Sequence, residues 1–328
     1  MKFKRAKIVA QTGCILCGSA DTSTEENIAV DSILELYGEN RRELVRQELH
    51  GAARIRVQRC SNCSLYFFDP ALPGSQAYYE SLQSFKWYYL KDKVEYAMAR
   101  KRIPPGARVL EIGCGAGWFA RSIPECIYTG LEYSETAATA ARSAGLDVLT
   151  QSVYDHASTH RAAYQVVCTF QVLEHVSDPA AFLSACIECL EPGGLLIHAL
   201  PSNEGYLKYL PNAFLNLPPH HLTRWPDKTL EALAGIYPLS LVALEHEPLA
   251  AIHQRTCASA MIRRQFDRML GRKPVFVDRS IGSRITGRCA DLLALGVSPL
   301  LSEDAFRPKG HSVIATYRKL APAARAVA

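Results

Sequence analysis

Between residues 106 and 201, short apolar runs alternate with longer segments in which apolar residues recur at helical spacing. Short apolar runs bounded by turn residues are typical of strands that are buried on both faces. Strands that alternate with helices in this way predict a parallel sheet covered by helices on both sides, an α/β fold. The expected strands are Arg108–Ile112, Ile127–Leu131, Val148–Leu149, Tyr164–Phe170 and 195–200.

The pattern continues toward the C-terminus with a helix over 227–233 and a sixth strand over 240–245. Two further helical segments, 253–270 and 282–295, precede an alternating last strand at 311–317. We expect that strand to return to the sheet beside the fifth and sixth strands. Residues of about 251–307 would then be a helical insertion within one domain, which extends over 106–320 and is followed by a tail at 321–328.

The N-terminal third follows a different pattern. Residues 31–49 have the apolar spacing of an amphipathic helix, and residues 53–58 alternate as a strand does. Turn signals near Pro73 place the end of a first module at 1–73. Residues 74–105 are helical and rich in aromatics, and we interpret them as a linker that packs on the next domain, as a lid over a ligand, or as both.

Composition narrows the class of protein. The 328 residues are enough for a full α/β core and one small module, and 48% of them are hydrophobic. The formal net charge of +5 includes 32 acidic residues among the basic ones, so we do not expect a nucleic-acid partner. We see no apolar run long enough to span a membrane and no leader peptide, and we therefore expect a cytoplasmic protein.

Four of the eleven cysteines form two C-x-x-C pairs, Cys14 with Cys17 and Cys60 with Cys63. A C-x-x-C turn lets two thiolates bind one ion, and two such turns complete the tetrahedral shell of a structural zinc. Binding of the metal then stabilises a segment too small to have a core of its own. We therefore predict a zinc-binding module, with the segment between the two pairs as an insertion. Cys186 and Cys189 lie one helical turn apart, and we expect them to pack in the core.

Gly113, Gly115 and Gly117 follow the first expected strand and precede an expected helix near Trp118. Glycines at this place let the backbone approach a ligand closely and point helix N–H groups at it. Glu132 ends the next strand, about twenty residues further on, where an acid can accept hydrogen bonds from both hydroxyls of a ribose. NAD-dependent dehydrogenases use the same arrangement, so these residues alone leave two classes open.

Three motifs in order favour one of them. The stretch 109–117 resembles motif I of class I S-adenosylmethionine-dependent methyltransferases, in which a Glu precedes the glycine loop. The stretch 171–179 resembles the vLEHv-x-dP signature of the same class, and 190–194 resembles its L-x-PGG turn. The resemblance covers about 108–201 and implies a Rossmann-like seven-stranded sheet. The cysteine pairs and the 218–222 stretch resemble a branch that includes deoxysugar C-methyltransferases and quinone-pathway methyltransferases.

The resemblance also implies roles for single residues. The three glycines would form the turn under the methionine part of S-adenosylmethionine. Glu111 would hold its ammonium group and Glu132 its ribose diol. Adenine would lie near Ser152 and Val153, where the family often has an Asp in place of Ser152. Phe170 and Gln171 would border the sulfonium.

Glu174 and His175 follow directly, and we interpret them as capping residues of a turn beneath the pocket. In some related quinone-pathway O-methyltransferases, an acidic residue, a Glu and a His at this place bind a divalent ion. Gln171 stands where the first acid would be, so we do not predict that metal.

The irregular segment 202–225 follows the fifth strand, at the edge of the sheet where ligands bind in doubly wound folds. It contains His220 and His221, the candidates for the base that deprotonates the methyl acceptor. We favour His221 slightly and keep Tyr206 as a competing base. The alternative is that the histidines cap a helix or pack under the loop.

We expect a small-molecule methyl acceptor, with a sugar or nucleotide-sugar ahead of a phenol or quinone. The basic helix at 253–270 would then either meet an anionic acceptor or form a solvated surface. Two other functions stay open. They are RNA methylation by an enzyme with a zinc ribbon, and S-adenosylmethionine binding without catalysis.

Overall fold

The computed structural model describes residues 12–82, 93–302 and 308–321. Its main element is a seven-stranded sheet in the order β10-β11-β8-β7-β4-β5-β6. All the expected strands form, and the last three are longer than expected. The strands are β4 (Arg108–Ile112), β5 (Ile127–Leu131), β6 (Val148–Leu149), β7 (Tyr164–Phe170), β8 (Leu190–Pro201), β10 (Leu239–Pro248) and β11 (Lys309–Lys319).

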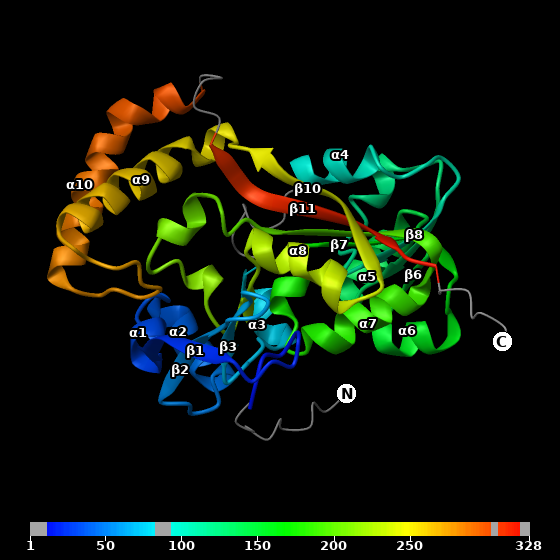
Figure 1. Cartoon of the computed structure of the whole chain (residues 1–328), viewed down its shortest axis with the longest axis horizontal. Coiled ribbons are helices and arrows are strands. Elements are labelled where there is room, and N and C mark those ends of the chain that lie inside the picture. Colours follow the sequence, from blue (N-terminus) through cyan, green and yellow to red (C-terminus); the bar gives the residue numbers. More distant parts are fainter. Residues whose placement is uncertain (1–11, 83–92, 303–307, 322–328) are drawn as a thin grey trace.

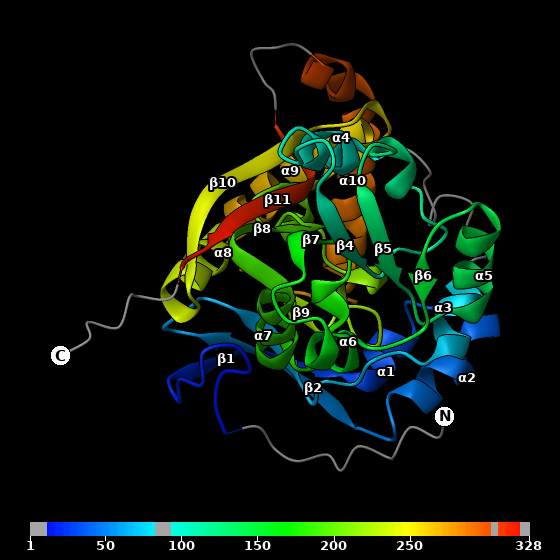
Figure 2. The same cartoon turned by 90° about the vertical axis from the view of Figure 1, so that its right-hand side faces the viewer.

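Parallel pairing joins β6, β5, β4, β7 and β8, and β11 pairs antiparallel with both β8 and β10. The expected place of the last strand, beside the fifth and sixth strands, is thus confirmed. Helices α6 (Val153–Thr159), α7 (Pro179–Cys189) and α8 (Asp227–Ile236) cover one face of the sheet (Figure 2). Helix α4 (Val94–Arg100) covers the other face, where Phe119 packs with it. Cys186 and Cys189 lie fully buried in the first of these layers, as expected.

The helix expected after the glycine loop does not form. Residues Ala120–Ser122 make only a short 3₁₀ turn. The reason is local, because Pro124 cannot donate to a helix and only a few residues separate it from Gly117. Any ligand at the glycine loop would therefore meet backbone N–H groups of a turn and not the end of a helix.

The N-terminal module contains a second, four-stranded sheet in the order β1-β2-β3-β9. Strands β1 (Thr22–Ala29), β2 (Arg54–Cys60) and β3 (Tyr66–Asp69) come from the module itself. The helix expected over 31–49 is two helices, α1 (Val30–Leu34) and α2 (Glu39–Glu48). Gly38 is the residue before α2 and has extended backbone geometry, which ends the helical run between them.

The fourth strand of that sheet, β9 (Thr223–Arg224), comes from the long segment after β8. It pairs antiparallel with β3, so that Tyr66 lies opposite Arg224 and Phe67 lies opposite Thr223. Leu65 and Phe67 of the module also belong to the same buried cluster as Trp225 and the core strand β4. The module and the larger sheet therefore share both hydrogen bonds and core.

Residues 75–102 contain α3 (Gln76–Leu82) and α4, as the expected helical pattern requires. Most of the aromatic run of that segment, Phe85 to Tyr89, lies outside the described residues. The expected insertion forms an arm of two helices, α9 (Gln254–Met269) and α10 (Ile281–Val297), which pack against each other at one end of the molecule (Figure 1). No helix among the described residues is both long and apolar enough to cross a membrane.

Candidate active site

The glycine loop occupies the carboxyl end of β4. Gly113, Gly115 and Gly117 all have positive φ, at 74°, 54° and 72°. A Cβ on Gly113 would lie 2.6 Å from Cγ2 of Val172, whereas a Cβ on Gly115 would meet no atom within 4 Å. The loop is thus packed at Gly113 and open at Gly115, where a ligand can approach the backbone.

Glu132 stands at the carboxyl end of β5, next to this loop. Its carboxylate accepts hydrogen bonds from the backbone N–H of Gly115 at 2.8 Å and of Ser134 at 2.7 Å. An ionised carboxylate has about four acceptor positions, so two remain for further donors. Glu132 is therefore held in place by the loop and still has the capacity to accept the two hydroxyls of a ribose.

Glu111, the last but one residue of β4, is 2% exposed and accepts a hydrogen bond from the Tyr128 hydroxyl at 2.6 Å. Burial is the main cause that raises the pKa of Glu111 to about 8. A cationic ligand beside this carboxylate would compensate for its burial. The side chain thus suits an ammonium group, as the motif resemblance implies.

The other expected cofactor residues lie on the same edge of the sheet. Ser152 precedes α6, and its hydroxyl accepts a hydrogen bond from the Asp155 N–H at 3.0 Å, while Val153 is buried. Phe170 ends β7 and packs on Phe119, with ring centroids 4.5 Å apart. Gln171 has a φ of 58°, which is unusual for a residue other than glycine and occurs often at functional sites. Its amide donates to the Ser312 hydroxyl at 3.3 Å.

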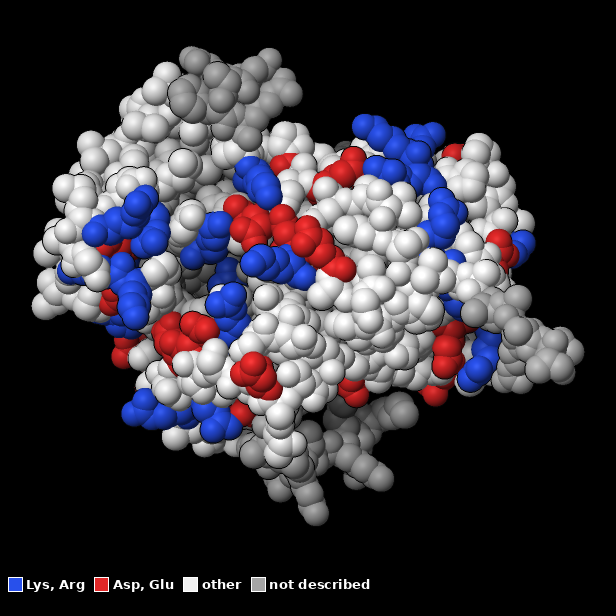
Figure 3. All heavy atoms as spheres, viewed as in Figure 1, with Lys and Arg blue, Asp and Glu red and all other residues white. Residues whose placement is uncertain are grey.

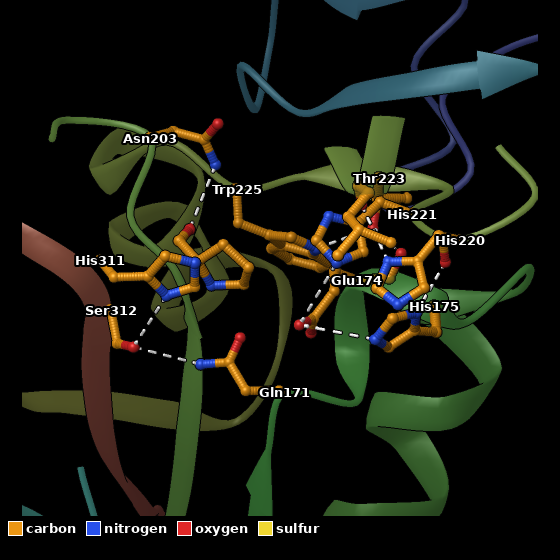
Figure 4. Close-up of polar contacts among 12 residues, drawn as sticks. Gln171, Glu174, His175, Asn203, His220, His221, Thr223, Trp225, His311 and Ser312 are labelled. Carbon is orange, nitrogen blue, oxygen red and sulfur yellow. Dashed lines mark hydrogen bonds and ion pairs between the residues drawn. The ribbon is translucent and has the colours of Figure 1, made fainter. Parts of the chain in front are cut away.

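A cluster of polar side chains, three of them buried and His175 half-buried, follows β7 directly (Figure 4). It consists of Glu174 and His175 from the turn after β7, and of His220 and His221 from the segment after β8. Glu174 Oε1 lies 3.7 Å from His175 Nε2 and 4.0 Å from His221 Nε2. The three imidazole rings lie within 4.6 to 4.9 Å of one another, centroid to centroid.

Backbone hydrogen bonds hold the cluster together. The Leu222 N–H donates to the Glu174 carbonyl at 2.8 Å, and the Leu222 carbonyl accepts from Phe68 of β3 at 3.0 Å. His175 Nδ1 donates to the His220 carbonyl at 2.6 Å, and His220 Nδ1 donates to the Leu215 carbonyl at 2.8 Å. A carbonyl only accepts, so both neutral imidazoles carry their proton on Nδ1.

The charge states of the cluster follow from its burial. Burial raises the pKa of Glu174 to about 8 and lowers the pKa of His175 to about 4. Burial also lowers the pKa of His220 and of His221 well below the ordinary value, and the neighbouring histidines lower both further. At neutral pH the imidazoles are therefore uncharged, and their lowered pKa makes them weaker bases than an exposed histidine.

Sequence reasoning interpreted Glu174 as a capping residue, and this interpretation is wrong. The side chain is 1% exposed, and within the described residues neither carboxylate oxygen has a hydrogen-bond partner. The available signal was the combination of an acid and a histidine directly after a buried strand, close to a second histidine pair in the fold. That pairing depends on contacts between distant segments, which the spacing of the motif does not show.

A small cavity opens beside the cluster, lined by Glu174 and His221 together with Asn203, Thr223, Arg224 and other residues. The Arg224 Nε donates to Asn203 Oδ1 at 2.9 Å. Burial lowers the pKa of Arg224 to about 10, so the guanidinium stays charged at neutral pH. The cavity therefore offers a cation and an amide near the candidate base, whereas the Thr223 hydroxyl already accepts from Trp225 Nε1 at 2.8 Å.

Tyr206, the competing candidate, is placed elsewhere. It is 4% exposed and belongs to a small cluster with Cys257, and its ring lies 6.0 Å from that of His253. Leu207, and not Tyr206, lines the cavity beside His221. Burial also raises the pKa of Tyr206, which makes it a weaker candidate for proton removal at neutral pH. The structure thus brings together two of the three expected catalytic residues.

The four expected zinc ligands converge. Sγ of Cys14 lies 3.5 Å from Sγ of Cys63, and Sγ of Cys17 lies 3.6 Å from Sγ of Cys60. Zinc–sulfur bonds of about 2.3 Å in a tetrahedron imply sulfur–sulfur separations of about 3.8 Å, close to those distances. All four sulfurs lie within 4.8 Å of one another, so the side chains fit a Cys₄ zinc site.

Among the described residues, one other group has the spacing of metal ligands. The ligand nitrogens of His175, His220 and His221 also lie within 4.8 Å of one another. The expectation that no metal binds beside Glu174 therefore stays a prediction that metal analysis has to test.

The fold and the site together define a class of protein. A mostly parallel seven-stranded sheet with one antiparallel strand, a glycine loop after β4 and an acid after β5 are those of class I S-adenosylmethionine-dependent methyltransferases. The chain belongs to the family described as methyltransferase domain, whose family model matches residues 80–243, half of the chain.

The chain matches part of several curated proteins that share one name. The ubiquinone biosynthesis O-methyltransferase of Hydrogenovibrio crunogenus is 35% identical over 110 residues, which are 31% of this chain and 45% of that protein. The protein of the same name from Xanthomonas axonopodis is 36% identical over 112 residues, which are 32% and 46% of the two chains. The chain thus spans about half the length of the curated relatives it matches.

Solved structures with a similar fold include a SAM-dependent methyltransferase from Archaeoglobus fulgidus. It is 16% identical, and the match covers 74% of this chain and all of that chain, with a TM-score of 0.46. An S-adenosylmethionine-dependent methyltransferase from Mesorhizobium loti matches 70% of this chain at 18% identity, again over its whole length, with a TM-score of 0.44.

Proposed function

We propose that this protein transfers the methyl group of S-adenosylmethionine to a small-molecule acceptor that binds in the cavity beside His221. One observation carries the proposal. The carboxyl ends of β4, β5 and β7 hold the glycine loop, Glu132 and Gln171, and the next residues after β7 lead directly to Glu174 and His175. A cofactor bound at the glycine loop and Glu132 and an acceptor bound beside Glu174 and His175 would meet at the end of β7.

The reaction supported by this arrangement is in-line displacement at the methyl carbon. The acceptor oxygen or carbon forms a bond to the methyl group as the bond from the sulfonium breaks, and S-adenosylhomocysteine leaves. The methyl donor is already activated, so the protein has to position the acceptor, exclude water and remove one proton. His221, neutral at neutral pH, takes that proton, and His220 and His175 hold it in place.

A sugar or nucleotide-linked sugar is the proposed acceptor, methylated on oxygen or carbon. The polar lining of the cavity supports this choice, because the Asn203 amide and the Arg224 guanidinium can bind hydroxyls. A phenolic quinone precursor is the second candidate. The name of the curated relatives, ubiquinone biosynthesis O-methyltransferase, favours it.

The four cysteines are proposed to bind one structural zinc ion. Their sulfur–sulfur distances support this proposal, and so does the Cys63 N–H, whose nitrogen lies 3.4 Å from Cys60 Sγ. The zinc would keep the two cysteine turns together at the edge of the sheet that contains β3 and β9. It supplies no step of methyl transfer.

Calorimetry tests the cofactor. S-adenosylmethionine and S-adenosylhomocysteine should bind, and NAD should not. Glu132→Ala should weaken cofactor binding by roughly 1–3 kcal/mol, the scale of a lost hydrogen bond to a charged acceptor. Glu125→Ala is the matched control, because this exposed acid lies before the other end of β5 and should leave affinity unchanged. Binding of NAD in place of the methyl donor would contradict the assignment.

The acceptor is tested by methyl transfer from labelled S-adenosylmethionine to three panels: sugar nucleotides, phenolic quinone precursors and bulk RNA. Label on a sugar nucleotide alone would support the proposed acceptor. Label on phenols alone would move the assignment to quinone-type O-methylation. Turnover on RNA alone would contradict a small-molecule acceptor.

A further inference from the structure

A second hollow lies between the segment after β8 and the helical arm, and none of the proposed steps uses it. Figure 3 shows Lys and Arg side chains gathered around a hollowed part of the surface beside α9 and α10. The charged residues that line the hollow are Lys208, Arg263, Arg264, Arg272, Lys273, Asp267 and Asp278.

Cations outnumber carboxylates in this lining, five to two. Asp267 does not neutralise its neighbours fully. Its carboxylate lies 3.9 Å from Arg263 Nε and 4.0 Å from Arg272 Nη1, too far for hydrogen bonds. Asp278 is already engaged, since it accepts a hydrogen bond from the Ser280 N–H at 2.9 Å. Lys208 Nζ donates to the Glu204 carboxylate at 3.1 Å, so four cations remain against two carboxylates, and the hollow keeps an excess of positive charge.

Two guanidinium nitrogens in the lining are buried without a hydrogen-bond partner among the described residues. They are Nε of Arg263 and Nη1 of Arg272. A buried donor that is left unsatisfied costs free energy, and more so on a charged group. The oxygens of a phosphate would satisfy such donors with short, charge-assisted hydrogen bonds.

The walls of the hollow are held by contacts between distant segments. Asn212 accepts a hydrogen bond from the Asp278 N–H at 3.0 Å and donates to the Asp278 carbonyl at 2.8 Å. Glu26 of β1 accepts from the Phe276 N–H at 2.6 Å. The Arg264 guanidinium carbon lies 5.7 Å from the centre of the Tyr209 ring. Arg263 and Arg264 thus belong to α9, and Arg272 and Lys273 belong to the loop after it, which these contacts brace.

The hollow also adjoins the acceptor cavity. Leu207 lines the cavity beside His221, and the next residue of the same turn, Lys208, lines the hollow. The Arg224 guanidinium, in the cavity wall, lies 4.9 Å from the ring centre of Phe276, in the loop between Lys273 and Asp278. One molecule can therefore occupy both places if its anionic part extends past Leu207.

We propose that this hollow binds a phosphate or diphosphate group of the methyl acceptor. The assignment to the acceptor rests on the proposed methyl-transfer function, whereas anion binding itself does not. An acceptor of this class would be anchored by its charge in the hollow while its reacting hydroxyl or carbon lies at His221.

Isothermal titration of the full chain with sodium pyrophosphate at constant ionic strength tests the site. Arg264→Gln and Lys273→Gln should each weaken binding about tenfold or more, the scale of one charge-assisted hydrogen bond. Arg268→Gln is the matched control, because it removes the same charge from the exposed side of α9, away from the hollow. Its affinity for pyrophosphate should stay within about twofold of the unsubstituted protein.

The site would be overturned by no binding of pyrophosphate at millimolar concentration. Equal losses in Arg264→Gln and Arg268→Gln would also overturn it, because they would indicate diffuse attraction. Tighter binding of single-stranded RNA, lost in the same variants, would overturn it in favour of nucleic acid. Thymidine diphosphate and thymidine, titrated in parallel, separate a phosphorylated small molecule from the free anion. Thymidine diphosphate should bind at least as tightly as pyrophosphate, and thymidine should not bind.

The link to the acceptor has its own readout. With a sugar nucleotide as substrate, Arg264→Gln should raise KM about tenfold and leave kcat nearly unchanged, because the anchor is distant from the proton transfer. Unchanged KM would overturn that link even where pyrophosphate binds. Failure of S-adenosylmethionine to bind would instead contradict the methyl-transfer proposal and leave the pyrophosphate result standing.

Discussion

Replacing Glu174 with Gln should stabilise the protein, and increasingly so as the pH rises. Glu174 is 1% exposed, and its carboxylate has no hydrogen-bond partner among the described residues. Burial raises its pKa to about 8, so the folded protein keeps this carboxyl protonated over a pH range in which the unfolded chain ionises it. Glutamine has the shape of the protonated acid and never carries the charge.

The sign and size follow from proton linkage. Between pH 4.5, the ordinary pKa of the group, and pH 8 the folded state binds the extra proton, so the free energy of unfolding falls as the pH rises. The cost grows by about 1.4 kcal/mol per pH unit over that range and levels off above it. Between pH 5 and pH 8.5 the difference between Glu174→Gln and the unsubstituted protein should change by about 4 kcal/mol in favour of Gln.

Urea unfolding of both proteins at pH 5, 7 and 8.5 measures this difference. Glu111, whose pKa burial also raises to about 8, titrates in both proteins and cancels in the comparison. Glu231→Gln, an exposed change on α8, should show no such dependence. A Glu174→Gln difference that stays constant within 1 kcal/mol across the range would show that Glu174 is already ionised in the folded protein, and would refute the reasoning.

Two further predictions concern the catalytic cluster and the cysteines. His221→Gln should lower kcat by about 10²-fold or more and leave S-adenosylmethionine affinity intact, whereas His220→Gln should have the smaller effect; full turnover in both variants would remove histidine as the base. Purified protein should contain one zinc ion per chain, and Cys60→Ser should lose it with a fall in Tm; elemental analysis without zinc would contradict the site. A second metal ion that persists in Cys60→Ser would place a metal at the three histidines.

The central strands could be predicted from sequence because their apolar runs are buried on both faces. The bounds of β4, β5 and β7 agree with the apolar runs, and the glycine loop and Glu132 follow from short-range spacing. The arm formed by α9 and α10 was also visible as amphipathic pattern. The local sequence pattern is enough to predict each of these elements, because none of them depends on contacts with distant segments for its pattern.

Features that depend on distant partners could not be predicted. Strand β1 is mostly polar and is a strand because β2 pairs with it. Strand β9 has only two residues and no pattern of its own. The same holds at the site, where His175 meets His220 across 45 positions of sequence. A motif shows each of these histidines, but the contact depends on how the segment after β8 folds back.

The pairing of β9 with β3 has a consequence for exchanging segments between relatives. Backbone hydrogen bonds join the segment that carries both candidate bases to the first module on either side of them, from Gly74 to Pro219 and from Phe68 to Leu222. Residues 12–74 and 214–225 thus form one packed unit, although more than a hundred positions of sequence separate them. A chimera that exchanges only the first stretch between relatives would mismatch the contact between β3 and β9. We therefore expect substrate preference to be transferred only when both stretches are exchanged together.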